Sequence, residues 1–188
     1  MRKNENQAGY TLLESLAVFA VISVVAVSLI NIVGHMYERY KNSRLEEQIV
    51  ELERAIGRRF AAAESYAGLS LKLLKNEKLI PADVDVSGTG DAVALKHKYG
   101  GAITISTTGT KPYEYTITFT KVPRVPCVEM ATRNWEQDQS SNLVSMTVNN
   151  NKLEWRTNDD TKRMPISTAS ANSFCNTEMS NTISWVFQ

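Results

Sequence analysis

The residues with the clearest chemical potential lie near the start of the chain, at Gly9, Tyr10 and Glu14. Residues 1–9 form a short polar leader, and after it Glu14 is the only formally charged side chain before Glu38. A carboxylate in hydrocarbon costs roughly 2.5–3.5 kcal/mol on insertion scales. An acid at this position therefore indicates a purpose, and the leader indicates a cleavage between Gly9 and Tyr10.

Cleavage at this junction would give Tyr10 a free α-amine, which is largely cationic near neutral pH. Glu14 lies four residues later, on the same face of a helix. The carboxylate could pair with this amine, or with the amine of a neighbouring subunit, where it would set the register between packed helices. The alternative is an acid at a helix start that is favoured by the helix dipole near the lipid headgroups.

The segment 15–33 is apolar throughout and long enough to cross a membrane. At 1.5 Å per residue, about 20 apolar residues span a hydrocarbon core of about 30 Å. Arg2 and Lys3 outnumber Glu5 in the leader, so the positive-inside rule predicts a cytoplasmic N-terminus and an exported remainder. We therefore divide the chain into a cleaved leader (1–9), a membrane-spanning or filament-core half-helix (10–36), and an amphipathic half-helix with a globular extracytoplasmic head (37–188).

The chain has two cysteines, Cys127 and Cys175, both in the predicted exported part. An even number of cysteines in an oxidising compartment favours a disulfide. This disulfide would close a loop of about 49 residues and add about 4 kcal/mol of stability in the chain-entropy model. Two free buried thiols are the alternative.

Neither an active site nor a metal site is predicted, and no cofactor is expected. The sequence has no CxxC pair, and the two histidines, His35 and His97, are far apart. Motifs such as GxSxG, HExxH and the P-loop are missing. We expect His97 to be a solvated loop or strand residue. Without residues 1–9 the chain has 19 basic and 19 acidic residues, a balance that argues against nucleic-acid binding.

The pattern beyond the apolar run predicts an α+β head. Apolar residues recur at spacings of three and four from Leu45 to Phe60, which extends one helix from Tyr10 to about Ala62. The charged residues between them, from Arg44 to Arg59 and including Glu53, should face solvent or a partner. The other predicted elements are a short helix within 65–79, hairpin strands at 102–107 and 113–121 with a turn at 108–112, a short helix at 126–133, hairpin strands at 143–148 and 152–155, a polar loop at 158–172 and a last strand at 182–187.

The sequence Gly9-Tyr-Thr-Leu-Leu-Glu14 followed by an apolar helix resembles the class III signal of type IV prepilins and pseudopilins. The resemblance implies that a prepilin peptidase cuts after Gly9, that Tyr10 is N-methylated, and that Glu14 is needed for assembly. The widely spaced cysteines, with Cys175 close to the C-terminus, are most like type IVb pilins, in which a disulfide brackets the C-terminal region. The implied fold is the pilin ladle, a long N-terminal helix packed on an antiparallel sheet.

The resemblance implies a structural subunit and not an enzyme. Such a subunit polymerises with copies of itself into a type IV pilus used for adhesion, aggregation or conjugation. Its implied partners are the prepilin peptidase and methyltransferase, the inner-membrane assembly machinery, and membrane lipid before assembly. The implied location is the inner membrane with the head in the periplasm, and then the extracellular pilus. The alternatives are a minor pilin or a type II secretion pseudopilin and, more distantly, a membrane-anchored periplasmic binding domain.

Overall fold

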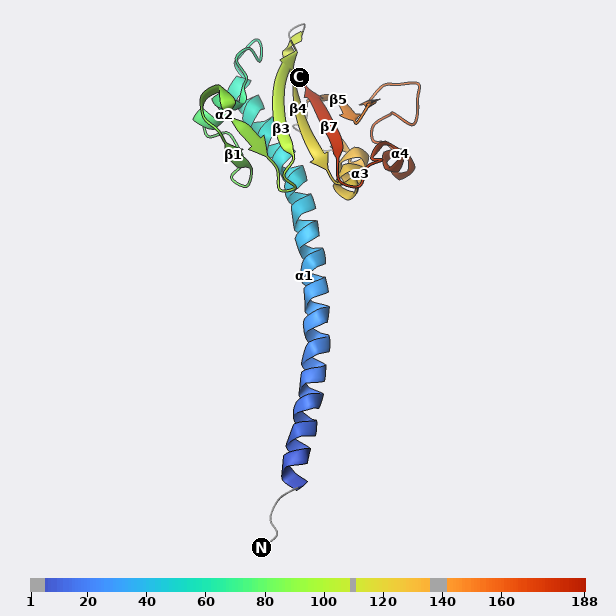
Figure 1. Ribbon diagram of the computed structural model, residues 1–188. Coiled ribbons are helices and arrows are strands. Elements are labelled where there is room, and N and C mark those ends of the chain that lie inside the picture. The colour runs from blue at the N-terminus through green and yellow to red at the C-terminus, as the bar shows by residue number, and fades with distance from the viewer. Residues whose placement is uncertain (1–5, 109–110, 136–141) are drawn as a thin grey trace. The chain divides into compact units, whose positions relative to one another are not determined.

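The computed structural model describes residues 6–108, 111–135 and 142–188, and the chain divides into two units, Met1–Lys41 and Asn42–Gln188. One helix, α1 (Asn6–Phe60), provides the described part of the first unit and continues into the second (Figure 1). It begins four residues before the predicted start and ends two residues before the predicted end. The prediction of one long helix through both regions is confirmed.

The second unit is built on a seven-stranded, fully antiparallel sheet with the strand order β1-β2-β3-β4-β7-β5-β6. The C-terminal strand β7 lies between β4 and β5, so the last residues of the chain join the two hairpins into one sheet. The strands are β1 (Asp85–Ser87), β2 (Ala94–Lys96), β3 (Ala102–Thr108), β4 (Lys111–Val122), β5 (Leu143–Val148), β6 (Asn151–Glu154) and β7 (Asn181–Phe187).

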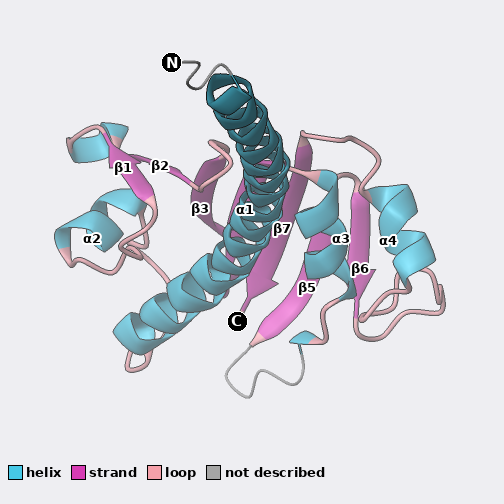
Figure 2. Cartoon of the chain, turned by 90° about the horizontal axis from the view of Figure 1, so that it is seen from below, coloured by secondary structure: helices cyan, strands magenta, loops and turns pink. Residues whose placement is uncertain are grey.

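Within the described residues, the short helices α2, α3 and α4 and the 3₁₀ turn η1 accompany the sheet. In Figure 2, α2 lies on the β1 side of α1, and α3 and α4 lie beside β5 and β6. Ser70 caps the N-terminus of α2, and Ser167 caps that of α4, each accepting a hydrogen bond from a backbone N–H three residues later. The bounds are α2 (Leu71–Asn76), η1 (Gly90–Ala92), α3 (Arg124–Thr132) and α4 (Thr168–Phe174).

The predicted apolar stripe of α1 forms part of the core of the second unit. Leu45, Ile49, Leu52 and Ile56 are fully buried, and Phe60 packs against the same cluster of buried residues. The inward residues of the sheet complete this cluster. Burying a large aliphatic side chain contributes about 1.5–3 kcal/mol, so these four residues alone are a major stabilising term.

The structure corrects several local predictions. His97 is fully buried and not solvated, because it continues the inward alternation of Val93 and Leu95 into the turn after β2. Glu53 is 7% exposed and does not face solvent. The predicted polar loop 158–172 ends early, since its last residues form the start of α4.

The predicted turn at 108–112 is shorter than expected, because β3 includes Thr108 and β4 already begins at Lys111. Residues 109 and 110 lie outside the described residues. The strands β1 and β2 were not predicted, and each has only three residues.

Candidate functional site

The part of α1 in the first unit has apolar side chains around its whole circumference. From Leu12 to Val33, thirteen described large apolar side chains are between 51% and 71% exposed. The helix is long and apolar enough to cross a membrane, with a mean hydropathy of 2.7 and none of the most apolar window buried. Because each such side chain favours burial by about 1.5–3 kcal/mol, this surface needs lipid or other protein to cover it.

The predicted processing and assembly residues lie at the start of this helix. Gly9 and Tyr10 are within the first turns of α1, and Glu14 follows one turn after Tyr10. The Glu14 side chain is exposed and projects from an otherwise apolar surface. The side chain of Tyr10 is not among those described. Residues 10 and 14 therefore lie one helical turn apart along α1.

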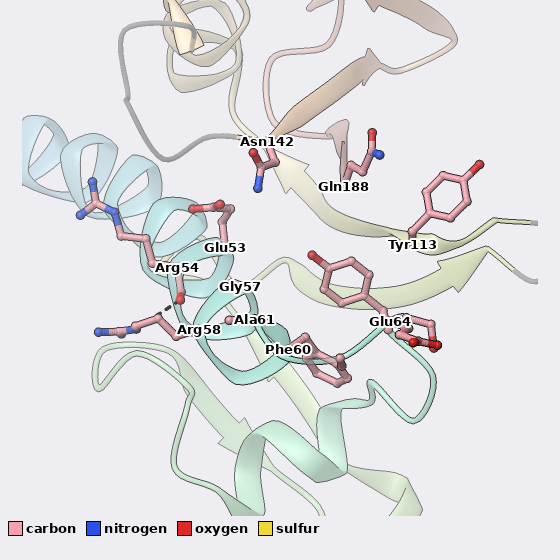
Figure 3. Close-up of a pocket in the computed structure, with 13 residues that line it drawn as sticks. Glu53, Arg54, Gly57, Arg58, Phe60, Ala61, Glu64, Tyr113, Asn142 and Gln188 are labelled. Carbon is pink, nitrogen blue, oxygen red and sulfur yellow. Dashed lines mark hydrogen bonds between the residues drawn. The ribbon is translucent and has the colours of Figure 1, made fainter.

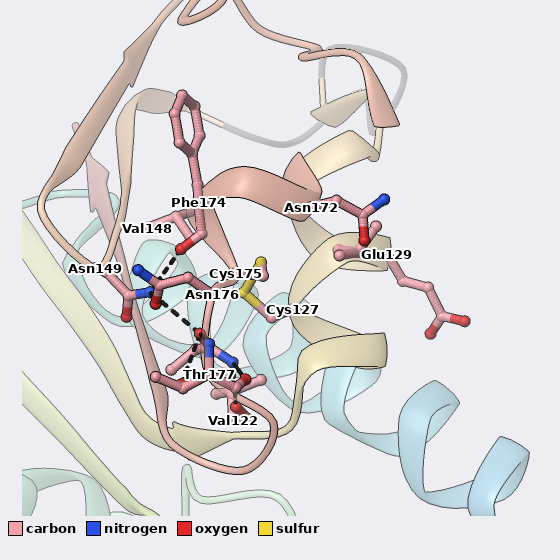
Figure 4. Close-up of a disulfide and its surroundings, with 12 residues drawn as sticks. Val122, Cys127, Glu129, Val148, Asn149, Asn172, Phe174, Cys175, Asn176 and Thr177 are labelled. Carbon is pink, nitrogen blue, oxygen red and sulfur yellow. Dashed lines mark hydrogen bonds between the residues drawn. A yellow bond between two sulfur atoms is a disulfide. The ribbon is translucent and has the colours of Figure 1, made fainter. Parts of the chain in front are cut away.

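Cys127 and Cys175 form the predicted disulfide, with a Cα–Cα distance of 6.0 Å and both residues fully buried (Figure 4). Cys127 belongs to α3, and Cys175 is the residue that ends α4. The disulfide therefore joins the two helices beside the β5–β6 side of the sheet and closes a loop that contains both of these strands. Free thiols, the alternative left open by the sequence, are excluded.

Beside the disulfide, Asn149 (labelled in Figure 4) and Asn181 join the loop after α4 to the sheet. Asn149, which has a positive φ of 52° in the β5–β6 turn, donates to the carbonyl of Phe174 at 2.7 Å and to Oδ1 of Asn181 at 3.1 Å. Asn181 is fully buried and donates to the carbonyls of Val122 and Thr177 at 3.0 and 2.7 Å. These bonds fix the disulfide region to β4, to β7 and to the β5–β6 turn. The sequence predicts a hairpin turn at Asn149, as asparagine is common in tight turns, but the hydrogen bonds of Asn149 and Asn181 to the loop after α4 were not predicted.

A partly buried polar cluster lies where α1 enters the second unit. Asp83 accepts hydrogen bonds from Nε of Arg44 at 3.0 Å and from Nε2 of Gln48 at 2.9 Å. Burial alone would raise the pKa of Asp83, but the bonds from Arg44 and Gln48 outweigh burial and hold it below its usual value. This cluster anchors the loop after α2 to α1, and no catalytic role follows from it.

His97 has both ring nitrogens engaged. Nε2 lies 2.7 Å from the carbonyl of Thr120, and Nδ1 accepts the backbone N–H of Tyr99 at 3.2 Å. The ring stacks on Phe119 with centroids 5.5 Å apart. Burial lowers the pKa of His97, and the bond to Thr120 opposes this shift. The histidine is neutral and structural in this arrangement, with Nε2 as the donor.

A cavity of about 610 Å³ opens at the C-terminal end of α1, and its lining includes Glu53, Arg58, Tyr66 and Tyr113 (Figure 3). The described lining contains no histidine, cysteine or aspartate. No group of three potential metal ligands occurs among the described residues. The three tryptophans are structural: Trp135 and Trp185 are buried in the core, and Trp155 packs against it.

The sequence matches the family model described as PilS N terminal over residues 39–188. No curated protein sequence matches the chain significantly. The fold is similar to the crystal structure of a type IVb pilin from Salmonella typhi, with a TM-score of 0.51 and 18% identity, covering 74% of this chain and 97% of that one. It is also similar to the crystal structure of TcpA, a type IV pilin from Vibrio cholerae El Tor biotype, with a TM-score of 0.51 and 11% identity, covering 79% of this chain and 99% of that one.

Proposed function

The chain belongs to the PilS family and is a type IV pilin, most like type IVb pilins, and from this premise we propose that it is the polymerising subunit of a type IVb pilus. One observation carries the proposal: an apolar half-helix exposes its side chains all round, and the same helix continues into a disulfide-bonded head. Pilins in general are structural subunits, and we propose no enzymatic activity for this one.

We propose that the subunit begins as a membrane protein with its head in the periplasm. Residues 10–36 would span the inner membrane, and residues 37–188 would lie outside the cytoplasm. A prepilin peptidase would remove residues 1–9 and a methyltransferase would modify the amine of Tyr10. The inner-membrane assembly machinery would then move the apolar half-helices from lipid into a filament core, and the pilus would serve adhesion, aggregation or conjugation.

Glu14 would set the register of the helices in that filament. Glu14 follows Tyr10 by one helical turn in α1, so its carboxylate could reach the amine of the same subunit or of a neighbour. A helix in the wrong register would leave two charges unpaired in an apolar core, and breaking a buried ion pair by removing one partner costs about 3–5 kcal/mol.

The experiment introduces Glu14→Ala. Electron microscopy then compares the surface filaments of cells that make this variant with those of cells that make the unaltered chain. We expect few or no filaments, together with normal removal of the leader. Glu51→Ala is the matched control, because Glu51 is an exposed acid on the same helix beyond the apolar segment, and it should leave filaments unchanged. Normal filaments from Glu14→Ala would contradict the register role.

Processing is tested by intact-mass and N-terminal peptide analysis of sheared filaments. We expect a mature chain that begins at methylated Tyr10. A mature chain that begins elsewhere would refute the proposed cleavage, and an unmethylated Tyr10 would refute only the methylation. The abundance of this chain in the same filaments decides whether it is the major subunit.

A further inference from the structure

Three exposed lysines gather at one end of the sheet, where β2, β3 and β4 meet. Lys96 ends β2 and pairs with Ala102 in the β2–β3 register, and Lys98 follows in the turn. The backbone N–H of Ala102 donates to the Thr120 hydroxyl at 2.9 Å, and Lys121 is the next residue of β4. We call Lys96, Lys98 and Lys121 the lysine cluster. Within the described residues, none of the three has an ion-pair partner.

The turn that bears the lysine cluster is fixed to α1. The hydroxyl of Tyr99 donates to Oδ1 of Asn42, the first residue of the second unit. The buried His97 ring bridges Tyr99 N and Thr120 O. Gly101 completes the packing, since a Cβ there would lie 1.8 Å from the carbonyl of Thr120. The lysines therefore project from a rigid support at the end of the head where α1 enters.

Only a short stretch of chain connects Asn42, at this end of the head, to the apolar segment. Asn42 follows Val33 by nine residues, which is about 14 Å as helix and no more than about 32 Å when fully extended. If the apolar segment spans the bilayer, Asn42 is tethered near the headgroup layer, which extends about 5–8 Å beyond each side of the hydrocarbon core. Tyr37 and Tyr40 lie between Val33 and Asn42 in the sequence, and tyrosine is enriched at membrane interfaces.

We propose that the lysine cluster is a binding surface for anionic phospholipid headgroups, and that it holds the head of the unassembled subunit against the bilayer. A lysine ammonium is a compact charge with three donors, which suits a lipid phosphate. The nearby Arg124 is already paired with Glu178 at 3.2 Å, so the three lysines provide the uncompensated charge. This inference rests on the proposed function, because it requires α1 to be inserted.

The test uses the full mature chain reconstituted into lipid vesicles and a fluorophore on one added cysteine. Both natural cysteines are in the disulfide, so an added cysteine is the only free thiol. Ala102→Cys places the fluorophore in the lysine cluster, and Thr107→Cys places it towards the other end of β3, about 17 Å away. A nitroxide on the lipid headgroup quenches a fluorophore that comes close to the membrane surface.

We expect stronger quenching at residue 102 when about a third of the phosphatidylcholine is replaced by phosphatidylglycerol, and little change at residue 107. The difference should shrink in 1 M salt, where the Debye length falls to about 3 Å. The triple variant Lys96→Gln, Lys98→Gln and Lys121→Asn should lose the increase in quenching at residue 102 that anionic lipid causes. The ratio of membrane-bound to free heads should fall roughly fivefold for each lysine removed. Asn is chosen at 121 because φ is 54° there.

A matched control removes the same charge elsewhere, through Lys72→Gln, Lys75→Gln and Lys78→Asn in and after α2. Lys78 also has a positive φ, of 56°, and a bond from Arg59 to Glu77 places this region beside the last turn of α1. The control should keep the lipid-dependent quenching. Equal quenching in neutral and anionic vesicles would overturn the inference, as would full quenching by the lysine-cluster variant. Failure of the chain to resist alkaline extraction from the vesicles would refute membrane insertion itself, and with it the proposed function.

Discussion

The disulfide should provide a large part of the stability of the head. Replacing Cys127→Ala and Cys175→Ala together removes a cross-link between residues 48 apart in sequence. In the chain-entropy model, a closed loop of this size stabilises the fold by about 4 kcal/mol at 25 °C. A domain of this size is stable by about 5–15 kcal/mol, so the loss is a quarter or more of the total. Both residues are fully buried, and removing the two sulfurs adds a smaller packing loss.

Urea unfolding of the full chain in detergent micelles measures this loss. The three tryptophans, at 135, 155 and 185, all lie in the second unit, so their fluorescence reports on the head and not on the apolar half-helix. With a slope of about 2 kcal/mol per molar urea, a loss of 4 kcal/mol lowers the unfolding midpoint by about 2 M.

The matched control compares how a thiol reductant affects the unfolding of the unaltered chain and of the double variant. Unfolding the unaltered chain in the presence of a thiol reductant should move its curve onto that of the double variant, because the cross-link is lost once the chain opens. The double variant itself should be insensitive to reductant. A midpoint shift below about 0.5 M would refute the reasoning, because the cross-link would then contribute no more than an ordinary side-chain contact.

Three further predictions use the same assay. Gly101→Ala should destabilise the head by about 3 kcal/mol or more, because the added Cβ would lie 1.8 Å from the carbonyl of Thr120. Gly57→Ala should instead stabilise the head by about 0.5–1 kcal/mol, because the added Cβ meets nothing within 4 Å and alanine favours a helix. Asn181→Asp should cost about 3 kcal/mol, since an ionised carboxylate cannot donate to the two carbonyls that Asn181 binds. His97 has a lowered pKa in the fold, so below about pH 6.5 the unfolded chain takes up a proton that the folded chain does not. The free energy of unfolding should therefore decrease by up to about 1.4 kcal/mol for each pH unit by which the pH is lowered, and His97→Gln should remove this component. Equal pH slopes for the unaltered chain and the variant would contradict the reasoning.

The sequence predicts the elements whose pattern is local and repeated. The buried stripe from Leu45 to Ile56 was found because a helix face recurs every three or four residues, and the strands of the β3–β4 hairpin were found because they alternate. The central place of β7 could not be predicted in this way, since the pairing of Ile183 with Phe119 and with Val148 joins segments far apart in the chain. No local pattern encodes such a partner.

The burial of His97 shows a different limit of sequence reasoning. Lysines on both sides suggest a solvated segment, yet Leu95 and His97 share the inward face of the strand and the turn that follows it. The polar ring is acceptable there because the backbone of Tyr99 and Thr120 satisfies both nitrogens. Its burial therefore depends on partners that lie up to 23 residues away, whereas the two lysines that misled the prediction are its immediate neighbours.

The exposed apolar half-helix also bears on why Glu14 should control assembly. The thirteen described large apolar side chains between Leu12 and Val33, at about 1.5–3 kcal/mol each, favour burial by roughly 20–40 kcal/mol, which exceeds the stability expected of the head. Lipid tails are about as apolar as leucine, so moving these side chains from a bilayer into a bundle of identical helices changes this term little. The free-energy difference between the two environments then depends on the polar groups of the segment. Glu14 is the charged side chain among them, and only in the filament would it come within reach of the amine of a neighbouring subunit. We therefore expect Glu14→Gln, which keeps the shape and removes the charge, to insert in the membrane at least as well as the unaltered chain and still to assemble poorly. Filaments in normal number from this variant would show that shape and not charge directs the register.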